Sequence, residues 1–208
     1  MNARSRDSDR GLRFGVGEFE DHVLEEQVPH STALQARLAG RGRYLTGPLA
    51  RYALSGRWLS PTARAAADRA GLGPECRNPF RSIVVRAVEL VYAIEEALRL
   101  IAGYEPPRPA AVPCPPRAGI GYGATEAPRG TLFHRYEIAA DGTVASARIV
   151  PPTSQNQAAI EDDLRQFVQP RLHLDDHRLT HECEQAIRNY DPCISCATHF
   201  LDLTVERT

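Results

Sequence analysis

The feature that most constrains the fold is a long helix, which the sequence predicts over residues 79–102. Asn78 is a good helix cap, and Pro79 suits the first helical position. Gly103 and the prolines after it end the helix. At 1.5 Å per residue its length is roughly 35 Å. Apolar residues recur along it at helical spacing: Ile83, Ala87, Leu90, Val91, Ile94, Leu98 and Ile101. We therefore expect this helix at the centre of a helical bundle.

A β-hairpin is predicted over residues 131–150. Apolar residues alternate in both halves of this segment, and Asp141-Gly142 supplies the turn. The preceding residues, 105–130, are rich first in proline and then in glycine. Such a segment is either a flexible linker or an ordered functional loop, and we favour an irregular loop that lines a pocket. The expected fold class is α+β, mainly a helical bundle around residues 79–102 with one hairpin.

Shorter helices are expected on both sides of these elements. Leu34 and Leu38 lie four residues apart, which suggests a short helix over residues 31–38. Further helices are expected over residues 62–70, 157–169 and 176–189. The last of these leads directly into a segment with two cysteines near the end of the chain.

Composition narrows the function classes. The 208 residues carry a formal net charge of −1, which gives no reason to expect a nucleic-acid partner. No apolar run approaches the ~20 residues of a membrane span. Five cysteines without a secretion signal favour a reducing compartment, and we expect the cytoplasm. Residues 1–29 are polar and interrupted by glycines, so we expect a poorly ordered start before one folded region, 30–208.

The residues that most suggest chemistry are Cys193, Cys196 and His199, which are spaced three apart. If Asp191 caps a helix and Pro192 takes its first position, the three side chains share one face. Thiolates beside an imidazole suit nickel, iron or zinc. From the spacing alone, a metal site is the favoured interpretation of the two cysteines, ahead of a redox dithiol. A pair of inert buried cysteines is nearly as well supported.

A structural zinc site is one form of this metal site. Cys193, Cys196 and His199 supply three ligands, and His181 or Cys183 on the preceding helix could supply the fourth. The ligand types fit zinc, although the spacing is not typical of known zinc motifs.

Three further residues have both an ordinary and a functional interpretation. Arg129, between a proline and a glycine, is either a surface residue or a guanidinium directed into a pocket. Asp191 is either a helix cap or the acceptor that orients that arginine. Thr153 is either a turn residue or a hydroxyl donor to a metal-bound ligand.

Three segments, taken together and in order, resemble the large subunit of nickel–iron hydrogenases. Residues 190–199 read YDPCISCATH, which matches the C-terminal metal motif of that family. Residues 126–130 (EAPRG) and 150–156 (VPPTSQN) resemble two further segments around its active site. The similarity is strongest to the cytoplasmic, NAD(P)-linked branch. The resemblance implies that residues 30–208 are the C-terminal portion of such a subunit.

The resemblance also implies a set of ligands. The family's site is a nickel and an iron held by four cysteines, and the iron carries carbon monoxide and cyanide. Carried over by motif, Cys193 is a terminal nickel ligand and Cys196 bridges nickel and iron. His199 and the backbone carbonyl of Ile149 bind a nearby magnesium.

Residues around the metals follow from the same resemblance. Arg129 stands over the open coordination position, with Pro128 beside it and Asp191 as its partner. Thr153 donates a hydrogen bond to a cyanide. The implied catalytic residues are therefore Arg129, Asp191, Cys193 and Cys196.

The implied activity is the interconversion of hydrogen with protons and electrons. The implied partners are a small subunit with iron–sulfur clusters, NAD(P)-linked diaphorase subunits and a protease that clips the chain after His199 during maturation. The family's second cysteine pair, in an R-x-C-G-x-C setting, is missing from this sequence. We therefore expect a chain that supplies half of the ligands and is inactive alone. The alternative is a non-catalytic subunit or fragment with a structural zinc at Cys193, Cys196 and His199.

Overall fold

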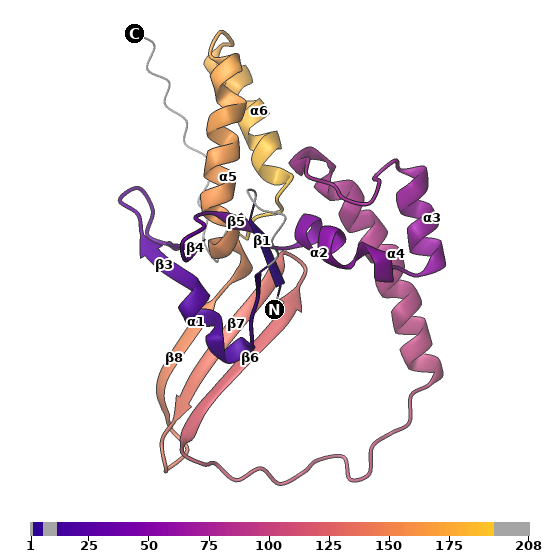
Figure 1. The fold of residues 1–208 in the computed structure, drawn as a ribbon, viewed down its shortest axis with the longest axis vertical. Coiled ribbons are helices and arrows are strands. Elements are labelled where there is room, and N and C mark those ends of the chain that lie inside the picture. The colour runs from indigo at the N-terminus through magenta and orange to yellow at the C-terminus, as the bar shows by residue number, and fades with distance from the viewer. Residues whose placement is uncertain (1, 6–11, 194–208) are drawn as a thin grey trace.

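The computed structural model describes residues 2–5 and 12–193, and within them the fold is α+β. Figure 1 shows a long twisted sheet, a pair of helices standing at one end of it, and a second helical group to its side. The sheet has the order β6-β7-β8 and is antiparallel. Its strands are β6 (Gly119–Ala127), β7 (Gly130–Ile138) and β8 (Val144–Val150). The standing helices are α5 (Pro152–Val168) and α6 (Asp176–Arg188), joined through the short helix η4 (Gln169–Arg171).

The predicted long helix is confirmed. The Asn78 side chain accepts a hydrogen bond from the Phe80 N–H at 2.9 Å, and a single 3-10 turn, η3 (Pro79–Arg81), leads into α4 (Ser82–Ala102). Its partners are α2 (Pro48–Ser55) and α3 (Pro61–Arg69), with the short helix η2 (Gly56–Trp58) between them.

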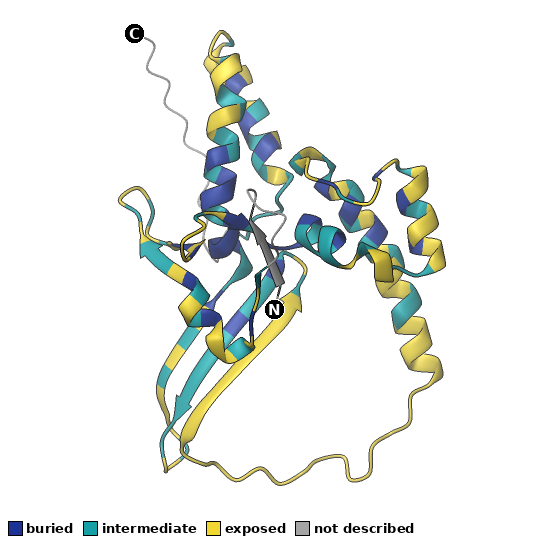
Figure 2. Ribbon diagram, viewed as in Figure 1, coloured by how far each residue is buried: buried dark blue, intermediate teal, exposed yellow. Residues whose placement is uncertain are grey.

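The predicted inward stripe of α4 is wrong. The buried residues of the helix are Ser82, Val85 and Val88. Val85 and Val88 pack toward α2 and α3, and the Ser82 hydroxyl donates to the Asn189 carbonyl at the end of α6. Of the predicted stripe, Val91 packs partly buried against this core. Its other large residues are exposed: Ile83 (59%), Leu90 (61%), Ile94 (55%), Leu98 (62%) and Ile101 (72%). Figure 2 shows the lower part of α4 exposed. The helix therefore lies at the edge of a small helical group and not at the centre of a bundle, because α2 and α3 cover one face alone.

The predicted hairpin is confirmed as the antiparallel pair β7 and β8. The turn uses Gly142 with a φ of +87°, and the Asp141 carboxylate accepts hydrogen bonds from the N–H and hydroxyl of Thr143. The irregular loop expected up to residue 130 is wrong from Gly119 onward. Strand β6 pairs with β7 over its whole length, because glycines that look like breakers alternate with residues that suit a strand.

The expectation of a poorly ordered start is wrong from Leu12 onward. Phe19 stacks on Phe133 of β7 with ring centroids 4.0 Å apart, and both are fully buried. The segment contains β2 (Leu12–Arg13), η1 (Val16–Glu18), α1 (Phe19–His22) and β3 (Val23–Gln27). It was missed because a few aromatic residues, not a periodic pattern, attach it to the core.

The short helix expected over residues 31–38 is also wrong. This segment forms β4 (Leu34–Leu38), which pairs with β3 so that Ala36 and Leu38 enter the core. Pairing with the preceding strand overrides the local four-residue spacing. A further small sheet joins β1 (Asn2–Ser5) to β2 and to β5 (Tyr44–Leu45). Among the described residues, none of the helices is long and apolar enough to cross a membrane.

Candidate metal centre

The turn between β6 and β7 carries Pro128 and Arg129 and is packed against the start of α2. A Cβ atom on Gly130 would lie 2.0 Å from the Thr46 Oγ1, and one on Gly47 would lie 2.5 Å from the Arg129 carbonyl oxygen. Both glycines have positive φ angles, +138° and +90°. A side chain at either position would push the turn away from α2, so these glycines fix where Arg129 leaves the sheet.

Arg129 meets Asp191 as predicted. Its Nε donates a hydrogen bond to the Asp191 backbone carbonyl, and it lies 3.3 Å from the Asp191 Oδ2. The backbone of Asp191 is left-handed, with a φ of +50°, unlike the extended backbone usual for a helix cap. The Nη1 of Arg86 lies 4.0 Å from the same carboxylate. Asp191 is therefore an acceptor for arginine, the less common of its two interpretations.

Thr153 holds the cysteine segment from the other side. It lies in the first turn of α5 and is buried, and its hydroxyl oxygen accepts a hydrogen bond from the Cys193 N–H at 3.3 Å. Cys193 is half-buried. Arg129, Asp191, Thr153 and Cys193, which come from three separate parts of the sequence, thus meet at the junction of the sheet with α5.

The remaining predicted residues have different outcomes. Cys196 and His199 lie outside the described residues. Pro128 is exposed beside Arg129. Ile149 lies near the end of β8, paired with His134, and its role as a carbonyl ligand stays a prediction. Among the described residues there is no group of three histidine, cysteine or acidic side chains placed to hold a metal.

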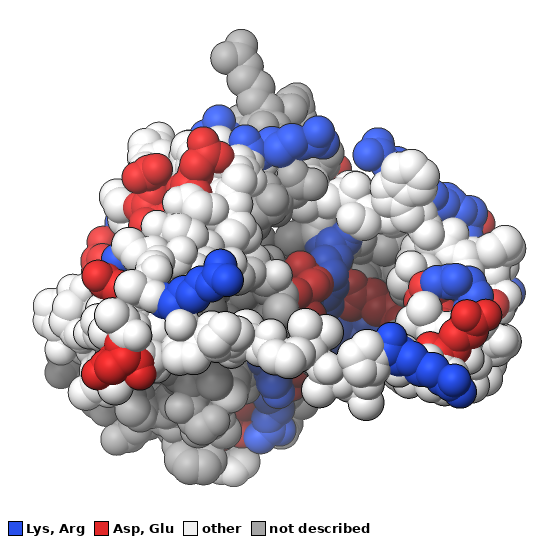
Figure 3. All heavy atoms as spheres, turned by 90° about the horizontal axis from the view of Figure 1, so that it is seen from below, with Lys and Arg blue, Asp and Glu red and all other residues white. Residues whose placement is uncertain are grey.

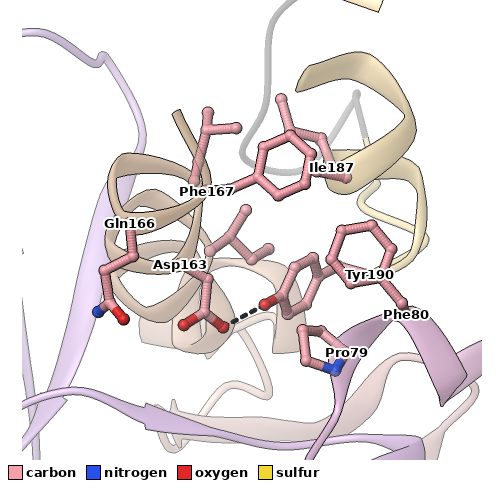
Figure 4. A pocket seen from close by; sticks show the side chains of 10 residues that line it. Pro79, Phe80, Asp163, Gln166, Phe167, Ile187 and Tyr190 are labelled. Carbon is pink, nitrogen blue, oxygen red and sulfur yellow. Dashed lines mark hydrogen bonds between the residues drawn. The ribbon is translucent and has the colours of Figure 1, made fainter. Parts of the chain in front are cut away.

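The cysteine segment begins at Tyr190, which is anchored against α5. Its hydroxyl donates a hydrogen bond to the Asp163 carboxylate (Figure 4). Its ring lines an apolar pocket of about 240 Å³ between α5, α6 and the start of the long helix, together with Phe80 and Phe167. This anchor delivers the following residues toward Thr153.

Polar side chains of α5 that sequence reasoning did not single out support the site. The Asn156 Oδ1 accepts a hydrogen bond from the Thr46 N–H at 2.7 Å, and its Nδ2 donates to the Arg129 carbonyl at 3.2 Å. The fully buried Gln155 donates to the Thr131 carbonyl at 2.6 Å and accepts from the Tyr44 hydroxyl at 3.0 Å. Their signal in the sequence is a run of polar residues at the start of a helix that must pack against the sheet.

The donor chemistry fits a soft metal. A thiol, a guanidinium and a hydroxyl converge, and such a set suits thiolate-bound metals with anionic or diatomic ligands. The candidates for a fourth zinc ligand fit less well. Burial raises the pKa of the Cys183 thiol, with a smaller contribution from Glu182, and this opposes the thiolate that zinc requires. His181 is exposed and hydrogen-bonded to Gln185.

Comparison with known proteins agrees with this chemistry. The family model described as nickel-dependent hydrogenase matches residues 89–199, more than half of the chain. Sulfhydrogenase 1 subunit alpha of Pyrococcus furiosus is 31% identical over 199 residues, which cover 93% of this chain and 45% of that protein. NAD-reducing hydrogenase HoxS subunit beta of Cupriavidus necator is 31% identical over 203 residues, covering 90% and 41%.

A solved structure agrees as well. The NAD+-reducing NiFe-hydrogenase in its H2-reduced state matches with a TM-score of 0.71 and 26% identity, over 88% of this chain and 42% of that chain. The chain therefore spans less than half the length of the relatives that it matches. On the match over residues 89–199 and the shared fold, the chain belongs to the nickel-dependent hydrogenase family.

Proposed function

We propose that this chain supplies one half of a nickel–iron centre and, once that centre is complete, takes part in interconverting hydrogen with protons and electrons. The observation that carries the proposal is the convergence of Arg129, Asp191, Thr153 and Cys193 at one end of α5. Cys193 and Cys196 would hold the metals. When bound, the nickel–iron group supplies the redox chemistry.

The side chains around the cysteines have defined tasks in this proposal. Asp191 neutralises and orients Arg129, so that the remaining guanidinium N–H groups can donate hydrogen bonds to an anionic or diatomic ligand. The Thr153 hydroxyl oxygen is used by the Cys193 N–H, and its hydrogen remains to donate to a cyanide on the iron. His199 and the Ile149 carbonyl would bind magnesium, and carbon monoxide would complete the iron ligands.

The other two thiolates must come from another polypeptide segment. The remaining cysteines are placed elsewhere: Cys76 and Cys183 are buried, and Cys114 is exposed. The exposed apolar face of α4 supports this need for a second segment. Ile94, Leu98 and Ile101 form a ridge that a second amphipathic helix would cover, and large exposed apolar patches commonly mark interfaces.

The proposal extends to the assembly. Electrons would leave through a small subunit with iron–sulfur clusters and reach NAD(P) through diaphorase subunits in the cytoplasm. A maturation protease would act after His199. The name of the HoxS relative, an NAD-reducing hydrogenase subunit, supports the choice of electron acceptor.

The test is co-expression of the full chain with a polypeptide that carries the R-x-C-G-x-C segment of a relative, under nickel-replete conditions. We expect about one nickel and one iron per complex, and loss of nickel in the Cys193→Ser and Cys196→Ser variants. Cys114→Ser, which changes an exposed cysteine in the connector, is the matched control and should retain both metals. One zinc per chain, with neither nickel nor iron, would establish the structural zinc alternative instead.

A further inference from the structure

Arg51 on α2 uses every hydrogen of its guanidinium group. Its Nε and Nη2 donate to the two carboxylate oxygens of Glu89 at 2.7 and 2.8 Å. Its Nη1 donates to the Glu126 carboxylate at 2.7 Å and to the Ala127 carbonyl at 2.9 Å, and Nη2 also donates to the Pro128 carbonyl at 2.9 Å. These five bonds match the five N–H groups of arginine. One side chain thus joins α2, α4 and the turn before Arg129.

The turn is held from its other side too. The third successive carbonyl, that of Arg129, accepts a hydrogen bond from Asn156 of α5. Gly47 allows α2 to approach this carbonyl closely. The backbone that carries Arg129 is therefore fixed between Arg51 and Asn156, while its guanidinium reaches away toward Asp191.

The charges favour this arrangement. Arg51 and Glu89 are each about three-quarters buried, and Arg51 and Glu126 line a cavity of about 360 Å³ beside the turn. Figure 3 shows acidic and basic atoms side by side in a hollow on the face seen from below. Burial lowers the pKa of Arg51, but the bonds and charges of Glu89 and Glu126 outweigh it, so the pKa lies above its ordinary value. The guanidinium stays charged.

We propose that Arg51 is a positioning residue for the hydrogenase reaction, because it fixes the Ala127 and Pro128 carbonyls and thereby the place of the Arg129 guanidinium against Asp191. The inference rests on the proposed function in assigning Arg129 to the metal centre. Lysine cannot replace Arg51, since the three N–H groups of one ammonium nitrogen cannot make five bonds to two carboxylates and two carbonyls. Misplacement of a reacting group by about 1 Å can cost on the order of 100-fold in rate.

The test compares Arg51→Lys with Arg81→Lys. Arg81 also donates to two backbone carbonyls, those of Ala70 and Gly71, but lies away from the turn. In the isolated full-length chain, we expect Arg51→Lys to raise the rate at which phenylglyoxal modifies Arg129 several-fold, as measured by peptide mass spectrometry. Arg81→Lys should leave that rate unchanged. Equal rates in the two variants would overturn the proposal.

The assembled enzyme gives a second readout. We expect Arg51→Lys to lower kcat at least 10-fold with little change in KM for hydrogen. It should add little to the loss caused by Arg129→Lys, because both changes act through one guanidinium. Independent, multiplicative losses would show that Arg51 has a merely structural role. If the wild-type complex binds no nickel and iron, the proposed function fails, whereas the labelling result on the isolated chain still decides whether Arg51 positions Arg129.

Discussion

Helices α4 and α5 depart in opposite ways from the usual burial of apolar and exposure of polar side chains. Helix α4 exposes most of its apolar ridge, whereas α5 buries four successive polar residues, Thr153–Asn156, in its first turns. In α5 each of these buried side chains has a partner, including the Ser154 hydroxyl, which donates to the Pro151 carbonyl at 2.8 Å. We attribute the exposed ridge of α4 to the second polypeptide segment that we propose, and the buried polar turn of α5 to the loops that it holds in place.

The largest expected effect tests the buried polar turn. Gln155→Leu removes a fully buried amide and leaves the Thr131 carbonyl and the Tyr44 hydroxyl without their partner. We expect the free energy of unfolding to fall by about 3 kcal/mol, measured by urea denaturation. Gln169→Leu, at the exposed position that follows the same helix, is the control and should change stability by less than about 0.5 kcal/mol. Equal effects at both positions would show that the turn does not depend on its polar network.

The next effect tests the two faces of α4. Val85→Ala empties a fully buried position and should cost about 2 kcal/mol, while Ile94→Ala on the exposed ridge should cost less than about 0.5 kcal/mol in the isolated chain. With the complementing polypeptide present, Ile94→Ala should instead weaken the complex, as measured by its dissociation constant. An Ile94→Ala variant that unfolds easily by itself would contradict the assignment of this face as an interface.

The third prediction concerns stability at alkaline pH and the Tyr44 hydroxyl, which donates to Gln155 in the buried polar turn. Burial, and to a smaller extent the Glu25 carboxylate, raises the pKa of Tyr44 above its ordinary value. A raised pKa in the folded state means that this tyrosine stabilises the fold below its unfolded pKa of about 10 and loses that contribution as the pH rises further. We expect stability to fall by up to about 1.4 kcal/mol per pH unit above pH ~10. The Tyr44→Phe variant should show a shallower slope in denaturation at pH 9, 10 and 11, and an unchanged slope would remove Tyr44 as the cause.

The smallest effect concerns Thr153. Thr153→Val keeps the shape of the side chain but leaves the Cys193 N–H without its acceptor, so we expect a loss of about 1 kcal/mol. Thr153→Ser keeps the hydroxyl and should lose less. Alkylation of Cys193, followed by mass spectrometry, should be faster in the valine variant than in the serine variant. The same rate in both would mean that the hydroxyl does not restrain the cysteine.

The sequence predicted the elements that local chemistry determines. Asn78-Pro79 and Gly103 set the ends of the long helix, and Asp141-Gly142 set the turn of the hairpin, because caps and turns depend on neighbouring residues. The pairing of Arg129 with Asp191 followed from the family resemblance and is present in the structure. The metal roles of Cys193 and its neighbours stay predictions.

Contacts between distant segments could not be predicted in this way. The insertion of Phe19 under the sheet depends on Phe133, a partner far away in the sequence. Strands β6 and β4 pair with the neighbouring strands β7 and β3, but the glycines of β6 and the four-residue leucine spacing of β4 conceal them in the sequence. The same holds for Arg51, which lies in an ordinary amphipathic helix and gains its role from two other elements. The direction of α4 was mistaken because both of its sides carry apolar residues, and periodicity alone does not say which side is covered first.

The central claim is that this chain holds one half of a nickel–iron centre, and infrared spectroscopy of the purified complex with its complementing polypeptide tests it most directly. The account predicts absorption bands from carbon monoxide and cyanide in the wild-type complex and their loss in Cys193→Ser. A stable complex that contains both polypeptides in equal amounts but shows none of these bands would contradict it.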